Sequence, residues 1–252
     1  MIPTVATGVL IFARLAGLLM VLPGIASRAV PSFARLVLAV PLTMLLLPAA
    51  SEMSVPGSLS ILFAQIASEA LLGVAMGFCV SLVFSSLSTA ADVISAQSGL
   101  QIASMLDPLT MSQPGAAGVL VTWLGTGIFF GGNVHLHCIL ALGESFHALP
   151  PGQIVSALGA GSVLLPLGGV VLSTGIQLAG PIIAFVFCVN LGLSLLGRMA
   201  PGLQLFFSVG PALTVAASLA LLAVTLPALL NAWYVSLPAG FDVLASLLRS
   251  AG

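Results

Sequence analysis

Long apolar runs, closed by proline, glycine or short polar turns, make up most of the chain. A membrane-spanning helix needs about twenty mostly apolar residues, because each residue adds about 1.5 Å and the hydrocarbon layer is about 30 Å thick. Several windows approach or exceed that length, although the second is short for a full span. We expect roughly six hydrophobic helices, at Ile2–Leu22, Leu36–Leu47, Ile61–Phe84, Val119–Leu142, Leu164–Leu196 and Phe206–Leu230.

Proline and glycine interrupt several of these windows. The Gly-Gly-Asn sequence at 131–133 breaks the fourth window. Pro181 is expected to divide the fifth, and Pro227 with Asn231 is expected to close the sixth. Backbone amides that leave a helix inside lipid find no water, so such breaks are tolerated where other protein or a water-filled cavity satisfies them. The pattern favours helical hairpins that assemble into a multi-subunit channel.

Two segments are less apolar than the windows. Residues Ala90–Met105 mix polar with apolar side chains, which predicts an amphipathic or protein-facing helix. The tail Phe241–Leu248 predicts a short amphipathic helix. The sequence contains no linker, fixed-period repeat or low-complexity stretch, so residues 1–252 predict a single domain.

Charged residues are scarce, at five Lys and Arg together and six Asp and Glu, and the mean hydropathy is +1.27. Soluble folds carry about a quarter charged residues, so this chain lacks a polar coat and must face lipid or other apolar protein. The predicted fold class is an all-α integral membrane protein. Scattered arginines do not form the clustered cations that nucleic acid requires. Three separated cysteines, Cys79, Cys138 and Cys188, are expected to be buried and unreactive.

Small residues recur at every fourth position in the third window. Residues four apart are neighbours on a helix face, so Glu69, Gly73, Gly77 and Ser81 form a strip of small side chains headed by a carboxylate. Such strips let two helix backbones approach closely. The facing helix belongs either to the same chain or to a neighbouring subunit, and the spacing does not distinguish the two.

Arg14 and Glu69 are ionisable groups inside apolar windows. Such groups are costly in a membrane and usually face a partner or a cavity. For Glu69 we favour a structural pairing with an arginine or with backbone amides over a proton relay. For Arg14 we favour a snorkelling or paired cation over a place in an ion pathway.

The His-Leu-His-Cys sequence at 135–138 raises a metal hypothesis. His135 and Cys138 would share a helix face, but His137 would point elsewhere, and only Glu144 and His147 lie nearby. Zinc needs four convergent ligands, so we expect no metal and no cofactor. Motifs for nucleotide binding, zinc proteases and serine hydrolases are absent, which argues against an enzyme.

Residues 105–115, which we call the apolar loop, contain two prolines and a glycine and are predicted to be non-helical. The loop is either a surface turn between two helices or a flexible seal whose methionines project into a lumen. Its defining residues are Met105, Leu106, Asp107, Pro108, Leu109, Met111, Pro114 and Gly115.

Ordered sequence blocks carry a family resemblance over nearly the whole chain. They are Phe12-Ala-Arg14-x-x-Gly17, then Ser27-Arg28-x-Val30-Pro31 and Arg35, then Glu69-x3-Gly73-x3-Gly77-Phe78, then Gln97-x-Gly99-Leu100-x-x-Ala103-x3-Asp107-Pro108, then Ser145-Phe146-x-x-Leu149-Pro150-x-Gly152, and finally Asn190-Leu-Gly192 with Leu196-x-Arg198-x-Ala200-Pro201. Together they resemble the FliR-type export-gate subunits of the bacterial flagellum, which are homologous to the SctT subunits of type III secretion. Gly202-Leu203-Gln204 departs from the fuller amphipathic segment of that family.

The resemblance implies a subunit of the flagellar type III protein export gate, without enzymatic activity or cofactor. It implies FliP-like and FliQ-like partners around a closed conduit for unfolded protein substrates, docked on FlhB-like and FlhA-like export proteins. The implied location is the bacterial inner membrane at the flagellar basal body, with the gate displaced toward the periplasm. Residues 106–118 are implied to plug the lumen. An SctT-like subunit of a virulence system and a small-solute secondary transporter stay open as alternatives.

Overall fold

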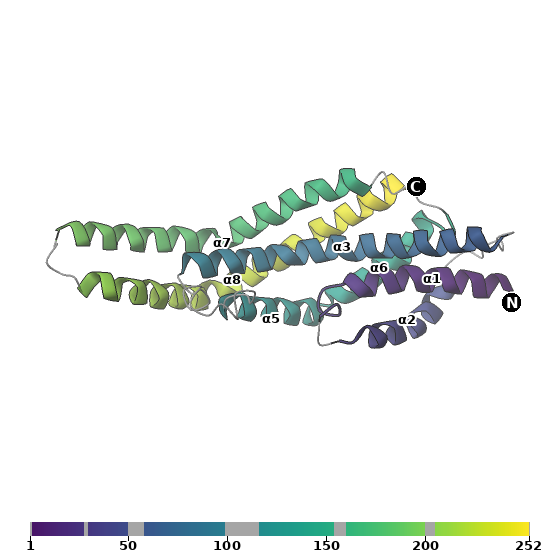
Figure 1. Cartoon of the computed structure of the whole chain (residues 1–252), viewed down its shortest axis with the longest axis horizontal. Coiled ribbons are helices and arrows are strands. Elements are labelled where there is room, and N and C mark those ends of the chain that lie inside the picture. The colour runs from purple at the N-terminus through teal and green to yellow at the C-terminus, as the bar shows by residue number, and fades with distance from the viewer. Residues whose placement is uncertain are drawn as a thin grey trace. The chain divides into compact units, whose positions relative to one another are not determined.

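Helices form all the regular secondary structure in the described part of the chain (Figure 1). The computed structural model describes residues 2–27, 30–49, 58–98, 116–153, 160–199 and 205–251. The predicted all-α fold class is confirmed over these ranges. The elements are α1 (Ile2–Val21), α2 (Ser32–Leu46), the 3-10 turn η1 (Leu47–Ala49), α3 (Leu59–Gln97), α5 (Ala116–Gly131), α6 (Val134–Ala148), α7 (Ala160–Met199) and α8 (Leu205–Ala251).

The chain forms two compact units, and α3, α5, α7 and α8 each contribute to both. The first unit contains Met1–Phe84, Ile128–Gly169 and Leu237–Gly252, and the second contains Ser85–Gly127 and Val170–Ser236. Neither unit is a continuous stretch of sequence. The single domain expected over residues 1–252 stays a prediction.

The core of the first unit combines apolar faces of α1, α3 and α6. In α6 the buried positions recur at intervals of three and four residues, which is the period of a helix that hides one face. The buried apolar residues include Leu10, Ile11, Leu15 and Leu18 of α1, Leu72, Met76, Cys79 and Val83 of α3, and Val134, Cys138, Leu142 and Phe146 of α6.

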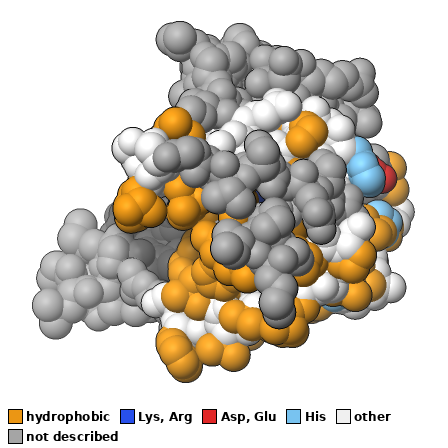
Figure 2. Space-filling view, turned by 90° about the vertical axis from the view of Figure 1, so that its right-hand side faces the viewer, with side chains coloured by type: hydrophobic (Ala, Val, Ile, Leu, Met, Phe, Trp, Pro, Cys, Tyr) orange, Lys and Arg blue, Asp and Glu red, His pale blue; other side chains and the backbone are white. Residues whose placement is uncertain are grey.

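The second unit leaves more of its apolar surface uncovered. In the most apolar 18-residue windows of α7 and α8, only 17% and 28% of the residues are buried. Large side chains such as Phe187, Met199 and Val224 are among those exposed. Apolar surface on this scale needs lipid or other protein to cover it. Hydrophobic side chains also cover much of the described surface on the face shown in Figure 2.

Three helices in the described ranges are long and apolar enough to cross a membrane, namely Leu59–Gln97, Gly168–Met199 and Ala212–Leu237. Gly118–Gly131 and Val134–Ala148 meet at a bend of 57° and count as a fourth span if they form one broken crossing. Two shorter apolar helices, in α1 and α2, bring the number of hydrophobic segments close to the six expected. The sequence prediction of a break at 131–133 is confirmed by the bend.

The predicted separation between Ile61–Phe84 and the segment from Ala90 is wrong. A single helix, α3, continues through both for 39 residues. The hydroxyls of Ser88 and Thr89 both donate to the carbonyl oxygen of Ser85, at 2.8 and 2.9 Å. Because these polar groups are satisfied within the helix, the serine-rich stretch does not end it.

Proline does not end α7 or α8, contrary to prediction. The predicted division at Pro181 is wrong, because α7 continues through it for 40 residues. The predicted close at Pro227 and Asn231 is also wrong, because α8 extends for 47 residues and includes the expected tail helix Phe241–Leu248. A proline removes one helical hydrogen bond, and membrane helices tolerate this where their surroundings satisfy the freed group.

The small-residue strip of α3 lies against α1. A Cβ atom on Gly73 would overlap the carbonyl oxygen of Arg14, and one on Gly77 would lie 2.8 Å from the carbonyl oxygen of Leu18. On the α1 side, a Cβ on Gly17 would meet the backbone of α3 in the same way. The glycines therefore let the two helix backbones touch, and at Gly73 and Gly77 the facing helix belongs to the same chain.

We predict that Gly73→Ala lowers the free energy of unfolding by about 1–3 kcal/mol, because the added methyl group forces α1 and α3 apart. The matched control is Gly127→Ala, since nothing lies within 4 Å of a Cβ at that position. The control should raise helix stability by about 0.5–1 kcal/mol. Thermal unfolding of the purified chain in detergent measures both, and equal melting temperatures for the two variants would contradict the close crossing.

Candidate functional site

A buried ion pair joins α1 to α3 in the first unit. Nε of Arg14 donates to Oε2 of Glu69 over 2.6 Å, and the two side chains are 1% and 0% exposed. Glu69 lies one helical turn before Gly73, so the close approach of the two backbones brings its carboxylate to α1. The expected pairing of Glu69 with an arginine is confirmed.

Arg14 also holds the C-terminal end of α6. Its two terminal nitrogens donate to Oγ of Ser145 and to the carbonyl oxygen of Leu149, each over 3.0 Å. The guanidinium carbon lies 4.5 Å from the centre of the Phe146 ring, which is a cation–π contact. One side chain of α1 therefore contacts the last turn of α6 and the residue that caps it.

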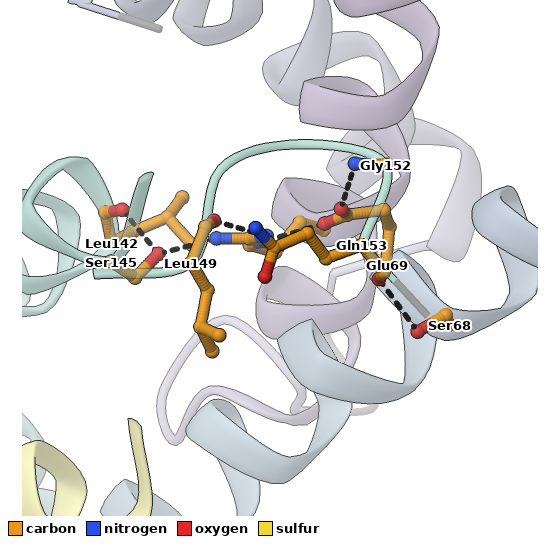
Figure 3. A network of polar contacts seen from close by, with 8 residues as sticks. Ser68, Glu69, Leu142, Ser145, Leu149, Gly152 and Gln153 are labelled. Atoms are coloured by element: carbon orange, nitrogen blue, oxygen red, sulfur yellow. Dashed lines mark hydrogen bonds and ion pairs between the residues drawn. The ribbon is translucent and has the colours of Figure 1, made fainter. Parts of the chain in front are cut away.

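Three residues of α3 hold the turn that follows α6. The amide of Gly152 donates to Oε1 of Glu69 at 2.9 Å, and its carbonyl oxygen accepts from Nε2 of Gln65 at 2.8 Å. Oγ of Ser68 donates to the carbonyl oxygen of Gln153 at 3.4 Å. Gly152 has a φ of 93°, a backbone conformation that favours glycine. In Figure 3, Ser145 and Leu149 lie on the left of the view, and Glu69, Gly152 and Ser68 lie on the right.

We call these groups the Arg14–Glu69 network, and in it each side-chain nitrogen of Arg14 and each carboxylate oxygen of Glu69 is hydrogen-bonded. Each carboxylate oxygen of Glu69 accepts a hydrogen bond, and three nitrogens of Arg14 each donate one. Desolvation costs several kcal/mol per ion, and attraction offsets it only where the remaining polar atoms are also bonded. The side chains of Arg14 and Glu69 meet that condition, whereas Oε1 of Gln65 is buried without a hydrogen-bond partner among the described residues. Because the carboxylate is fully engaged, it serves to hold α1, α3 and α6 together, and we favour this role over proton transfer.

A model of a protein family described as bacterial export proteins, family 1, matches residues 5–237. The chain belongs to this family. The flagellar biosynthetic protein FliR of Caulobacter vibrioides is 30% identical over 226 residues, which cover 89% of this chain and 90% of that protein. FliR of Escherichia coli K12 is 30% identical over 214 residues, covering 85% and 82%. The Yop proteins translocation protein T of Yersinia pestis is 31% identical over 158 residues, covering 62% and 60%.

The fold of this family 1 export protein brings separate sequence blocks together. The first block supplies Arg14, the Glu69 block supplies its partner, and a later block supplies Ser145, Leu149 and Gly152. The two ionic partners are 55 residues apart, and Arg14 and Leu149 are 135 apart. The blocks therefore meet at one network whose convergence is visible only in three dimensions.

Other residues of the family resemblance lie at turns and helix ends. Arg35 donates to the carbonyl oxygens of Ser27 and Val30, each over 2.8 Å, and so closes the turn between α1 and α2. Pro31 is the N-cap residue of α2. Ser81, the last residue of the predicted strip, is partly buried in α3.

Three further motif residues are exposed in the second unit. Gln97 is the last residue of α3, and Arg198 lies in the last turn of α7, where a cation complements the helix dipole. Oδ1 of Asn190 accepts from Oγ1 of Thr214 at 3.4 Å and links α7 to α8. The remaining predicted residues lie outside the described ranges, namely Arg28, Gly99, Pro201, Met105, Leu106, Asp107, Pro108, Leu109, Met111, Pro114 and Gly115.

No group of three His, Cys, Asp or Glu side chains that could hold a metal gathers in the described ranges. His137 contacts the carbonyl oxygen of Asn133, the N-cap residue of α6, through Nδ1. Cys79 and Cys138 are buried, as expected, but the expectation for Cys188 is wrong. Cys188 lies on α7, whose apolar surface is largely uncovered in the single chain, so an apolar neighbourhood in sequence did not imply burial.

Sequence reasoning missed Gln65, Ser68 and Gln153. The first two precede Glu69 by four residues and by one, which places a polar cluster at one end of the small-residue strip. That cluster was the available signal for a second polar partner. Nothing in the sequence indicated that this partner would be backbone at the end of α6.

We predict that Glu69→Met lowers the free energy of unfolding by about 3–5 kcal/mol, because it leaves the Arg14 guanidinium buried without its counter-ion. The double variant Arg14→Met with Glu69→Met should recover most of this loss, since apolar residues of similar size often replace a buried ion pair at little cost. Thermal unfolding of the two variants and of Arg14→Met completes a double-mutant cycle. Additive losses would show that the two side chains are not coupled.

Proposed function

We propose that this chain is the FliR-type subunit of a flagellar type III protein export gate. The gate lies in the bacterial inner membrane at the flagellar basal body. With FliP-like and FliQ-like subunits the chain encloses a closed conduit for unfolded protein substrates, and the gate docks on FlhA-like and FlhB-like proteins. The observation that carries the proposal is the family match over residues 5–237, together with FliR relatives aligned along most of their length.

The distribution of apolar surface supports a subunit that works inside an assembly. Helices α7 and α8 leave most of their apolar windows uncovered, and α2 buries only Ala39. At 15 residues, α2 is shorter than the roughly twenty that a spanning helix needs. Sister subunits that pack on these helices would cover the apolar side chains and satisfy the breaks in the backbone.

In the proposed gate the apolar loop is the seal. It lies between α3 and α5, outside the described ranges, so its support comes from the sequence. Its two prolines and its glycine oppose a helix, and its methionines are flexible and apolar enough to close around variable contents. A seal of this kind needs no cofactor and no catalytic residue, and it acts by sealing and opening the conduit.

A virulence type III secretion system is the second candidate, and one relative favours it. The Yop proteins translocation protein T is as similar in percentage identity, but its alignment covers 62% of this chain against 89% for FliR of Caulobacter vibrioides. The longer alignments favour the flagellum. Disruption of the gene in its own bacterium distinguishes the two, because loss of swimming supports the flagellar gate and loss of protein injection with normal swimming contradicts it.

We predict that deletion of Leu109–Gln113 leaves the gate assembled but makes the membrane leak small ions, because the seal is shortened. The measurement compares ion leak in membranes that carry the partner subunits with either the wild-type or the deleted chain. The matched control is Thr110→Ala with Ser112→Ala, which keeps every apolar side chain of the loop and should stay tight. A tight membrane after the deletion, with the complex formed, counts against the plug.

A further inference from the structure

Helix α6 concentrates ionisable side chains that are rare in the rest of the chain. All three histidines of the sequence, His135, His137 and His147, lie within its 15 residues, together with Glu144. In Figure 2, histidine and acidic side chains lie side by side at the right of the view. Neither the family-resemblance blocks nor the Arg14–Glu69 network uses any of these four side chains. Their presence in so apolar a chain therefore needs another explanation.

Three of the four project from one side of α6, which we call the polar face. His137, Glu144 and His147 are exposed, and Glu144 lies seven residues after His137 and three before His147, so the three share a side of the helix. Leu140, which is 64% exposed, lies among them. His135 is partly buried beside aromatic rings and does not belong to this face. The buried positions of α6 lie on the opposite side, so the polar face points away from the core of the first unit.

The polar face is not compensated as the other ionisable groups of the first unit are. Arg14 and Glu69 are almost completely buried and neutralise each other. Neither Glu144 nor His147 forms an ion pair with another described residue. Ionisable side chains in membrane segments are costly against lipid, and they face either the interior of the bundle or a water-filled cavity. Because the polar face points away from the interior, its chemistry favours water.

Helix α2 provides a comparison within the same unit. It also has 15 residues, and its exposed large side chains include Phe33, Val37 and Met44. Its arginine, Arg35, donates to backbone carbonyl oxygens. An outward face of this composition suits lipid or the apolar surface of a sister subunit. Two helices of equal length thus present different outward faces, and only that of α6 suits water.

The backbone at the start of α6 is exposed in the same way. Gly131 and Asn133 are exposed, and Asn133 has a left-handed φ of 58°. No described atom outside the local backbone lies within 4 Å of a Cβ built on Gly131. Non-helical backbone at membrane depth is tolerated where it is buried in protein or lines a water-filled cavity. Since this break is not buried within the chain, it supports the same surroundings as the polar face.

We infer that the polar face of α6 lines the water-filled conduit of the proposed gate, where it contacts water and the passing unfolded protein. The inference rests on the proposed export function. An unfolded substrate exposes amide donors and carbonyl acceptors along its whole backbone. Carboxylate and imidazole groups can bond to either kind of partner without selecting a sequence. Such bonds replace bonds to water at little net gain, so they would not trap the substrate.

The test measures how fast a thiol on the polar face reacts with a membrane-impermeant maleimide. The gate contains the full chain and its FliP-like and FliQ-like partners, in open membrane fragments that give the reagent access from both sides. Leu140→Cys places the thiol on the polar face and keeps all its ionisable residues, and Met44→Cys on α2, at a residue 70% exposed, is the matched control. Both are made with Cys188→Ala, which removes the exposed natural thiol.

Leu140→Cys should react at least about tenfold faster than Met44→Cys, because only the thiolate reacts and apolar surroundings keep a thiol protonated. An unfolded substrate stalled in the conduit should then remove most of the labelling at Leu140→Cys, because the substrate occupies the same space. Fast labelling that the stalled substrate leaves unchanged places the face in other water and overturns the conduit role.

The remaining outcomes separate this inference from the proposed function. An unreactive Leu140→Cys in an assembled gate overturns the inference and leaves the export function in place. Fast labelling of the chain alone, with protection in the empty gate, means that a sister subunit covers the face, and it overturns the inference as well. A chain that does not co-purify with the partner subunits contradicts the export function itself. Should Leu140→Cys fail to accumulate, Ala148→Cys decides by the same comparison, since Ala148 is exposed at the end of the same helix.

Discussion

The pairing of Arg14 with Glu69 is the interaction on which the first unit depends. Two charges in an apolar protein must be neutralised together, and every remaining polar atom around them must be bonded, or the fold loses several kcal/mol. The glycines at 17, 73 and 77 make this feasible, because they let α1 and α3 approach until the guanidinium reaches the carboxylate. The ion pair therefore depends on the close packing of α1 against α3, and the polar contacts to α6 depend on the ion pair.

The same chemistry explains why the network reaches the turn after α6. An arginine offers five N–H donors, and one carboxylate cannot accept all of them. The surplus donors require acceptors in a place without water, and Ser145 and the carbonyl oxygen of Leu149 accept two of them. The second carboxylate oxygen of Glu69, Oε1, likewise accepts a hydrogen bond from the amide of Gly152. The ion pair of Arg14 and Glu69 therefore joins α1 to α3 and also holds the C-terminal end of α6.

Hydropathy predicted the class of fold, the break at 131–133 and the pairing of Glu69, because each follows from local chemistry. It failed at Pro181 and Pro227, where the cost of a missing hydrogen bond is small compared with the cohesion of a long membrane helix. Hydropathy also wrongly predicted that the helix is interrupted between Phe84 and Ala90. The hydroxyl of Ser88 bonds within its own helix, so the helix continues. The convergence of Arg14 with Leu149 depends on contacts 135 residues apart, and no local pattern encodes such a distance.

Native-state hydrogen exchange at the amide of Gly152 tests the central claim most directly. This proton is bonded to Oε1 of a fully buried carboxylate at 2.9 Å, so exchange requires the turn at Gly152 to separate from Glu69. Exchange in the assembled protein should be slowed by about tenfold to two-hundredfold, because breaking a hydrogen bond to a charged group costs about 1.5–3 kcal/mol. Exchange close to the rate of an unprotected amide would contradict the claim that Arg14 and Glu69 fix the end of α6.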